Sequence, residues 1–213
     1  MKKLAIAVAS SSILLSGVSF SAAKTGIVVG GQVGYSELQN KLSSESLNTS
    51  TATVKNGNIT FGGIVGYDYA LMKNFSLGLE SGMNYNDQIV TLNDPGNDGF
   101  NLNNYDVPLL LTAKYYFGNF SLFAKAGYAY KHQKLKGTGT ASNVTYTMKK
   151  WVPVIGGGLG YDVMKNLTLY AQYTSEFGKN INDASNWDTT AAAPTQVFAS
   201  YSVVAGVTYT FGM

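Results

Sequence analysis

The sequence predicts an all-β fold, an eight-stranded antiparallel up-and-down transmembrane β-barrel, and three observations support it. Apolar and polar side chains alternate with period 2 in stretches of about ten residues, as they do in half-buried strands. Charge is scarce, with 13% charged residues against roughly 25% in soluble domains. Connections of a few residues alternate with connections of about twenty, the pattern of barrels with short turns on one side of a membrane and long loops on the other.

A separate element precedes the barrel. A basic start, Met-Lys-Lys, leads into an apolar run over residues 4–18, and Ser-Ala-Ala then offers small residues to a signal peptidase. We therefore expect 1–23 to be a signal peptide of the Sec pathway, cleaved between Ala23 and Lys24, and 24–213 to be the mature barrel domain. A membrane-anchor helix is the alternative, but three serines interrupt the run and it is short for a bilayer span.

Eight alternating segments follow in chain order, each long enough to cross a membrane at a tilt. One face of every segment is apolar and free of charge, whereas strand charges such as Asp68, Glu80 and Lys114 fall on the opposite face. The segments cover about 26–36, 58–69, 75–86, 105–117, 120–130, 151–162, 167–177 and 200–211.

The direction of the apolar face separates two classes of barrel. A soluble lipocalin-like barrel turns it inward, and a membrane barrel turns it toward lipid. The polar face is rich in Gly and Ser, which suit the narrow interior of an eight-stranded barrel. Aromatic residues of the apolar face gather at two rims, with Tyr67, Phe117 and Phe211 at one, and Tyr35 and Trp151 at the other. Amphipathic rings belong at membrane interfaces, so the apolar face is expected to meet lipid.

Four long connections are expected outside the cell, and three short turns are expected in the periplasm. The third long connection is rich in lysine (Lys131, Lys134, Lys136, Lys149 and Lys150), which suits lipopolysaccharide or host glycans, although ordinary solvated charge is the simpler interpretation. The long connections cover about 37–57, 87–104, 131–149 and 178–199.

The charges on the inner face are expected to form a network near the short turns. Glu80 and Lys114 are expected as neighbours on adjacent strands, and a hairpin at Gly118-Asn119 brings Lys125 into the same layer. An unpaired charge inside a narrow barrel costs on the order of several kcal/mol, so a Glu80–Lys114–Lys125 network follows. It would act either as a plug or as the gate of a narrow ion path, and the filled interiors of eight-stranded barrels favour the plug.

Catalytic and metal chemistry have little support in the residue types. The chain has no Cys and no Arg, which excludes disulfides, thiolate-metal sites and guanidinium clamps. His132 is the single histidine and has no serine nearby in sequence to serve as a nucleophile. The run Gly156-Gly-Gly-Leu-Gly160 lacks the following helix that a nucleotide-binding turn needs. We expect no enzyme, cofactor or metal site.

Four segments resemble the small outer-membrane β-barrel family, the OmpA/OmpX-type and opacity-like, porin-fold proteins of Gram-negative bacteria. They are Val107-Pro-Leu-Leu-Leu-Thr-Ala-Lys-Tyr-Tyr-Phe117, Ala126-Gly-Tyr128, Gly156-Gly-Gly-Leu-Gly-Tyr161 and Gly206-Val-Thr-Tyr209-Thr-Phe211. The resemblance covers the whole mature chain and implies a bacterial outer-membrane location. It also implies that Gly206, Tyr209 and Phe211 belong to a signal read by the assembly machinery, although two residues follow Phe211 here.

The expected function is that of a non-enzymatic outer-membrane protein with an envelope-structural or surface-adhesion role carried by its loops. A narrow channel for ions or small solutes is the alternative, and a lipid A-modifying enzyme comes third, because this fold hosts unrelated functions. Expected partners are outer-membrane lipid and lipopolysaccharide, the assembly machinery with periplasmic chaperones, and ligands on host or other cells. Two of the lysines behind the net charge of +3 lie in the signal segment, so nucleic acid is not expected.

Overall fold

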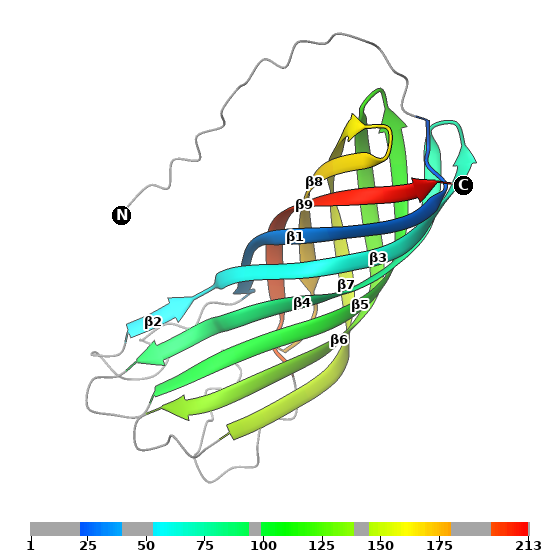
Figure 1. Ribbon diagram of the computed structural model, residues 1–213. Coiled ribbons are helices and arrows are strands. Elements are labelled where there is room, and N and C mark those ends of the chain that lie inside the picture. The colour runs from blue at the N-terminus through cyan, green and yellow to red at the C-terminus, as the bar shows by residue number, and fades with distance from the viewer. Residues whose placement is uncertain (1–21, 40–52, 94–98, 139–144, 180–196, 213) are drawn as a thin grey trace.

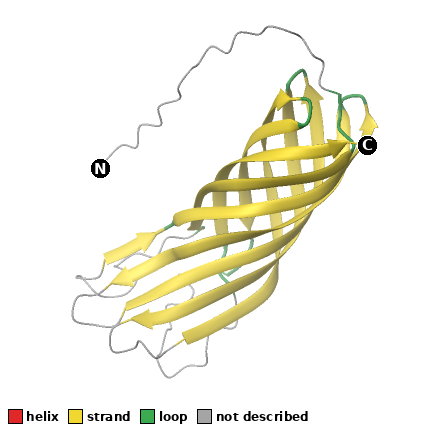
Figure 2. Ribbon diagram, viewed as in Figure 1, coloured by secondary structure: helices red, strands yellow, loops and turns green. Residues whose placement is uncertain are grey.

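The computed structural model describes residues 22–39, 53–93, 99–138, 145–179 and 197–212, and their regular structure is all strand (Figure 2). Among these residues, no helix is long and apolar enough to cross a bilayer. The strands are β1 (Gly26–Leu38), β2 (Thr53–Asn56), β3 (Asn58–Met72), β4 (Phe75–Asn93), β5 (Gly99–Phe117), β6 (Phe120–Thr138), β7 (Thr145–Met164), β8 (Leu167–Glu176) and β9 (Ser200–Gly212).

The strands close into an antiparallel barrel, as predicted (Figure 1). Successive long strands pair with each other, and β1 pairs with both β3 and β9, which joins the two ends of the sheet. The short β2 pairs with β4 and continues the line of β3 past Gly57. Gly57 takes a φ of +80° there, and a Cβ at this position would collide with the ring of Tyr35, so the break requires glycine.

Large apolar side chains cover the outside of the barrel. Ile27, Phe61 and Leu111 have exposed fractions of 52%, 55% and 69%, and similar side chains follow on every long strand. A belt of this extent has no place on a water-exposed protein surface. The predicted orientation of the apolar face is therefore confirmed, and the lipocalin alternative is wrong.

Three tight connections join β3 to β4, β5 to β6 and β7 to β8 among the described residues, as predicted. The β5–β6 connection uses Gly118 with a φ of +59°, a conformation that favours glycine. The start of β1 and the end of β9 lie at the same end of the barrel as these turns (Figure 1). The molecule thus has a short-turn end, which carries the chain termini of the barrel, and an opposite loop end.

The strands extend further toward the loop end than the alternation indicates. The β4–β5 pairing continues to Leu92 and Phe100, and the β6–β7 pairing continues to Lys136 and Thr145. The predicted loops over 87–104 and 131–149 are therefore wrong in their extent. Beyond the apolar belt the outward positions become polar, so the alternation fades while the backbone pairing continues. These hairpins project past the end of β8 (Figure 1).

The interior has an ionic part near the short turns and a largely apolar part toward the loop end, where the buried ion pair of Lys131 with Glu176 also lies. The expectation of a lumen lined by small and ionic groups is therefore wrong for the second half. The inward side chains there are large, because strands such as β5 and β7 carry apolar residues on both faces. The buried apolar cluster consists of Leu38, Ile89, Val90, Leu102, Leu110, Ala129, Leu135, Met148, Val152, Val154, Val197 and Phe198.

Candidate functional site: the charged lumen

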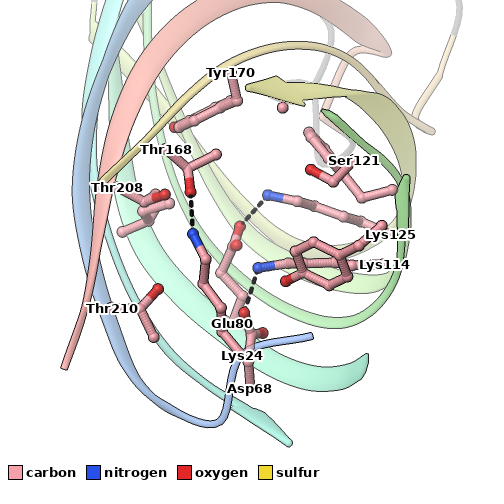
Figure 3. Close-up of a pocket in the computed structure, with 14 residues that line it drawn as sticks. Lys24, Asp68, Glu80, Lys114, Ser121, Lys125, Thr168, Tyr170, Thr208 and Thr210 are labelled. Atoms are coloured by element: carbon pink, nitrogen blue, oxygen red, sulfur yellow. Dashed lines mark hydrogen bonds and ion pairs between the residues drawn. The ribbon is translucent and has the colours of Figure 1, made fainter. Parts of the chain in front are cut away.

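Two ion pairs cross the lumen near the short-turn end (Figure 3). The Nζ of Lys125 on β6 lies 2.6 Å from Oε1 of Glu80 on β4. The Nζ of Lys114 on β5 lies 2.5 Å from Oδ2 of Asp68 on β3. All four residues occupy inward positions of their strands, so the alternation that turns apolar groups outward turns these charges into the lumen. Each ammonium group thus has a carboxylate partner.

The predicted network of Glu80, Lys114 and Lys125 is therefore divided between two pairs. Glu80 binds Lys125, whereas Lys114 binds Asp68. The alternation of apolar and polar residues predicts that Asp68 faces inward, but it does not identify Lys114 as its partner. The structure brings all of these residues to one pocket, which Lys24 also lines.

Strand register explains which cross-strand neighbours of the luminal charges could be predicted from the sequence. The tight β5–β6 turn sets its own register, and the predicted pairing of Lys114 with Phe123 is confirmed. The β4 and β5 strands have no turn between them at this end. There Lys114 lies opposite Ser76, and Glu80 lies opposite Leu110, so the prediction that Glu80 and Lys114 are cross-strand neighbours is wrong.

A third ion pair involves the residue that precedes β1. The Nζ of Lys24 lies 2.7 Å from Oδ1 of Asp162 and donates to the hydroxyl of Thr168 at 3.0 Å. Thr168 in turn donates to Asp162 at 2.6 Å. The sequence gave no signal for this luminal role, because Lys24 precedes the first alternating segment. Cleavage between Ala23 and Lys24 stays a prediction, and residues 1–21 of the expected signal peptide over 1–23 lie outside the described residues.

Aromatic rings form part of the wall around these charges. The Lys125 ammonium lies 5.1 Å from the ring centroid of Phe123 and 5.8 Å from that of Tyr170, both within the range of cation–π attraction. The pocket holds about 450 Å³ of space, open solvent included. Its lysines Lys24, Lys114 and Lys125 match three carboxylates in number, so the arrangement is suited to holding strands together through paired charges.

A layer of amides crosses the lumen above the ion pairs. Gln32 donates to Oδ1 of Asn84 at 2.6 Å, and Asn84 donates to Oδ2 of Asp106 at 2.8 Å. The hydroxyl of Tyr170 donates to Oε1 of Gln32 at 2.9 Å. These contacts link β1, β4, β5 and β8 across the interior, so the lumen is spanned at this level by hydrogen-bonded side chains.

The chain segment just before β9 enters the loop end of the lumen. The backbone N–H of Phe198 donates to Oε1 of Gln133 at 2.8 Å, and its carbonyl accepts from Nζ of Lys131 at 3.1 Å. Lys131 also lies 2.7 Å from Oε2 of Glu176, and its side chain is 0% exposed. The interpretation of Lys131 as a solvated loop charge is therefore wrong. It holds the segment that contains Phe198 inside the barrel.

The three residues of the expected assembly signal lie on two faces of β9. Tyr209 and Phe211 point outward with exposed fractions of 40% and 54%, and their ring centroids are 4.7 Å apart. Gly206 faces inward, where an added Cβ would come within 2.5 Å of the Tyr170 ring. That the assembly machinery reads these residues stays a prediction.

His132 lies on the outer surface of the barrel rather than in the lumen. Its Nδ1 shares a hydrogen bond of 2.7 Å with the hydroxyl of Tyr105, and the two rings stack with centroids 4.4 Å apart. Within the described part of the chain, no three acidic or histidine residues are grouped so as to hold a metal ion.

The family model described as "Outer membrane protein beta-barrel domain" matches residues 5–211. Among solved structures, the chain is similar to Neisserial surface protein A, with 14% identity, 87% of this chain and 97% of that chain covered, and a TM-score of 0.49. It is also similar to OprG from Pseudomonas aeruginosa, with 10% identity, 91% and 100% covered, and a TM-score of 0.48. For Ail, the attachment invasion locus protein of Yersinia pestis, identity is 13%, coverage 86% and 99%, and the TM-score 0.43.

No curated protein matches the chain. The family match extends over nearly all of the closed barrel described above, including every strand that lines the charged lumen. The chain therefore belongs to the outer membrane β-barrel family, and it is a protein of the bacterial outer membrane.

Proposed function

We propose that the chain is a closed, non-enzymatic scaffold of the outer membrane whose external loops make contacts outside the cell. The observation that carries this proposal is the buried apolar cluster in the external half of the lumen. Leu102, Met148 and Phe198 are 0%, 1% and 2% exposed, so the cluster is buried as completely as a protein core. An ion that passed between these side chains would have to give up its hydration against apolar groups, which is costly in free energy.

The polar pocket at the periplasmic end is the one feature that favours a channel. It is lined by charged and hydroxyl groups, as the entrance of an ion path would be. The lumen above it is crossed by the amide layer around Gln32 and Asn84, and then by the apolar cluster. Both layers support a plug, so the pocket is a periplasmic recess in a barrel that is closed further toward its external end.

The projecting hairpins support a role outside the cell. The paired strands of β4–β5 and β6–β7 continue beyond the end of β8, so they offer a rigid base at the external end (Figure 1). Loops on rigid scaffolds commonly carry binding functions. The positions at which the strands end thus support the contact role, and experiment identifies the partner that the loops bind.

Conductance tests the closed state directly. Purified, folded protein inserted into planar lipid bilayers is expected to give no current steps across the range of applied voltage. Steady unitary steps would instead identify a channel.

The contact role is tested by adherence. Bacteria that display the protein are measured for adherence to a host-cell layer before and after treatment with external protease. Adherence is expected to disappear when the loops are cut, and adherence that is absent or unchanged would contradict the contact role.

Lipid A chemistry is tested separately. His132 is engaged with Tyr105 on the outer surface, which is no arrangement for activating a nucleophile. Mass spectrometry of lipid A from cells with and without the protein is expected to give identical masses. A gain or loss of an acyl chain would show that the barrel is an enzyme.

A further inference from the structure

Aromatic rings mark the external membrane interface on the outward face of β6 and β7. Tyr130 and Trp151 lie opposite each other in the β6–β7 register, with ring centroids 5.5 Å apart. Trp151 is 56% exposed on the lipid side. Rings that are amphipathic and exposed in this way sit at the level of lipid headgroups. Whatever lies next along these strands therefore faces the headgroup region of the outer leaflet.

The next outward residues on both strands are basic. His132 pairs with Lys149 across the strands, one step beyond Tyr130 and Trp151. Lys134 is the following outward residue on β6, and Lys136 follows it. Side chains paired across strands lie about 5 Å apart at Cβ, and those two residues apart on one strand lie about 7 Å apart. We call His132, Lys134, Lys136 and Lys149 the basic patch.

The described carboxylates do not neutralise the basic patch. Those of Asp68, Glu80, Asp106, Asp162 and Glu176 are buried in the lumen, and Glu37 is buried beside Tyr201. Asp87 on β4 carries the only exposed carboxylate among the described residues. The three lysines of the patch form no ion pair with any described residue. Because most described acids lie in the lumen, the outer face keeps Lys134 and Lys149 as a diagonal pair on neighbouring strands, with no described carboxylate between them.

Like charges on neighbouring strands repel each other, and an anion held between them relieves that repulsion. Partial burial and then the positive charges of Lys149 and Lys134 lower the pKa of His132, so the imidazole already responds to an uncompensated positive field. An anion at this level of the membrane must have an apolar part among the exposed rings and a charged part beside the lysines. A phosphorylated lipid has both.

We propose that the basic patch binds the phosphate groups of a phosphorylated lipid of the outer leaflet, of the lipid A type. The phosphate would lie between Lys149 and Lys134, which reach it from neighbouring strands, and the acyl chains would lie along the apolar belt below Trp151. This inference is independent of whether the barrel conducts or adheres. The site lies on the outer wall of the barrel, apart from both the loops and the lumen.

The test uses Trp151 as a reporter. The full mature chain is folded in detergent with Trp187→Phe throughout, which leaves one tryptophan beside the patch. Lipid A with its phosphates is titrated into the Trp187→Phe protein, called the background protein, and into the same protein with Lys134→Gln/Lys149→Gln. Binding is followed by the fluorescence of Trp151. Each charge removed beside an anionic headgroup weakens binding about fivefold, so the double variant is expected to bind more than tenfold more weakly. Lys73→Gln/Lys165→Gln, with two exposed lysines in periplasmic turns, is the matched control and is expected to bind normally.

Each arm has an outcome that overturns the proposal. Equal binding by Lys134→Gln/Lys149→Gln and the background protein would show that the patch is not the site. Equal binding of lipid A stripped of phosphate would show contact with acyl chains alone, and an equal loss in the control would show a dependence on net charge alone. Release of lipid A by excess inorganic phosphate would mean that a free anion, rather than a lipid, is recognised. Unchanged heat-dependent gel mobility verifies that both variants are folded.

Discussion

Lys125 and Glu80 are buried together in the lumen. Their effect on the stability of the protein depends on whether one of them or both are replaced. The 2.6 Å contact offsets the cost of taking two charges out of water. When one partner is deleted, the other remains as an uncompensated buried charge. The pair is therefore expected to matter far more in single variants than in a variant that lacks both charges.

The first prediction follows from this asymmetry. Glu80→Ala is expected to lower the free energy of unfolding by about 3–5 kcal/mol, because Lys125 is left buried without its carboxylate. Glu80→Gln/Lys125→Met is expected to be close to wild type. The measurement is urea unfolding of the protein in lipid vesicles, followed by gel mobility. A single variant as stable as the double variant would mean that the pair has no structural role.

His132 supplies the second prediction, on the outer surface beyond the aromatic rim. Partial burial, Lys149 and Lys134 lower its pKa below the ordinary value of 6.5, and it also faces Tyr105. Folding thus favours the neutral imidazole, and this contribution to stability is present above pH 6.5 and is lost as the pH falls through the folded pKa. An NMR titration of this single histidine is expected to show the lowered pKa.

The same titration has a built-in control. In Lys134→Gln/Lys149→Gln the pKa of His132 is expected to rise toward 6.5, because two of the three causes that lower it are gone. In Lys73→Gln/Lys165→Gln it is expected to stay where it is. A pKa of His132 at or above 6.5 in the wild-type protein would contradict the positive field that the structure places there.

Side chains could be assigned to a face from the sequence, but their partners could not. Alternation placed Glu80, Lys114 and Lys125 correctly in the lumen, because the parity of a strand position decides its face. The partners depend on how strands that are far apart in sequence slide against each other. Lys24 and Lys131 were missed for a different reason. One lies before the first alternating segment, and the other lies beyond the apolar belt, where no alternation indicates a face.

Strand β9 shows how a whole element depends on one small residue. Gly206 is the point where β9 passes over the ring of Tyr170 and beside the carbonyl of Gly31. Gly31 itself has open space, since the nearest atom to an added Cβ is 3.8 Å away. The two glycines lie on neighbouring strands of one barrel, and they differ in whether a side chain fits.

The third prediction compares these two positions. Gly206→Ala is expected to cost about 1–3 kcal/mol of unfolding free energy, the usual range for overpacking a filled interior, because Tyr170 must move. Gly31→Ala is expected to be tolerated. Heat-dependent gel mobility after folding into vesicles compares the two variants. Equal stability would show that Tyr170 moves freely and that packing does not require glycine at position 206.

Element boundaries were predictable at the short turns and unpredictable at the loop end. At Gly118-Asn119 a two-residue turn ends both strands at once, and the sequence marks it with the residues that such turns need. At the other end nothing in the sequence stops the pairing of β6 with β7. The strands continue through Lys134 and Lys136 into water, where backbone hydrogen bonds still form but side chains need no longer alternate.

Across the whole molecule, the barrel wall separates an apolar outer surface from a charged interior. Within the interior, the residues also change in character along the barrel axis. Most described acids lie in the lumen together with the four lysines that pair with them, and the other described lysines lie toward the two ends of the barrel. Within the described lumen, three ion pairs occupy the periplasmic part, while the external part holds the apolar cluster and the buried pair of Lys131 with Glu176. A barrel with this division is closed by its external half, whatever the periplasmic ion pairs do.

The fourth prediction tests that division. Leu102→Ser/Met148→Ser places two hydroxyl groups inside the apolar cluster, where both native side chains are at most 1% exposed. Water can then enter and bind there, so brief current fluctuations are expected in planar bilayers, whereas the wild-type protein stays silent. Glu80→Gln/Lys125→Met, which leaves the cluster intact, is expected to stay silent as well. If that variant conducts while the serine variant does not, the barrier lies at the periplasmic ion pairs, and the lumen is gated rather than plugged.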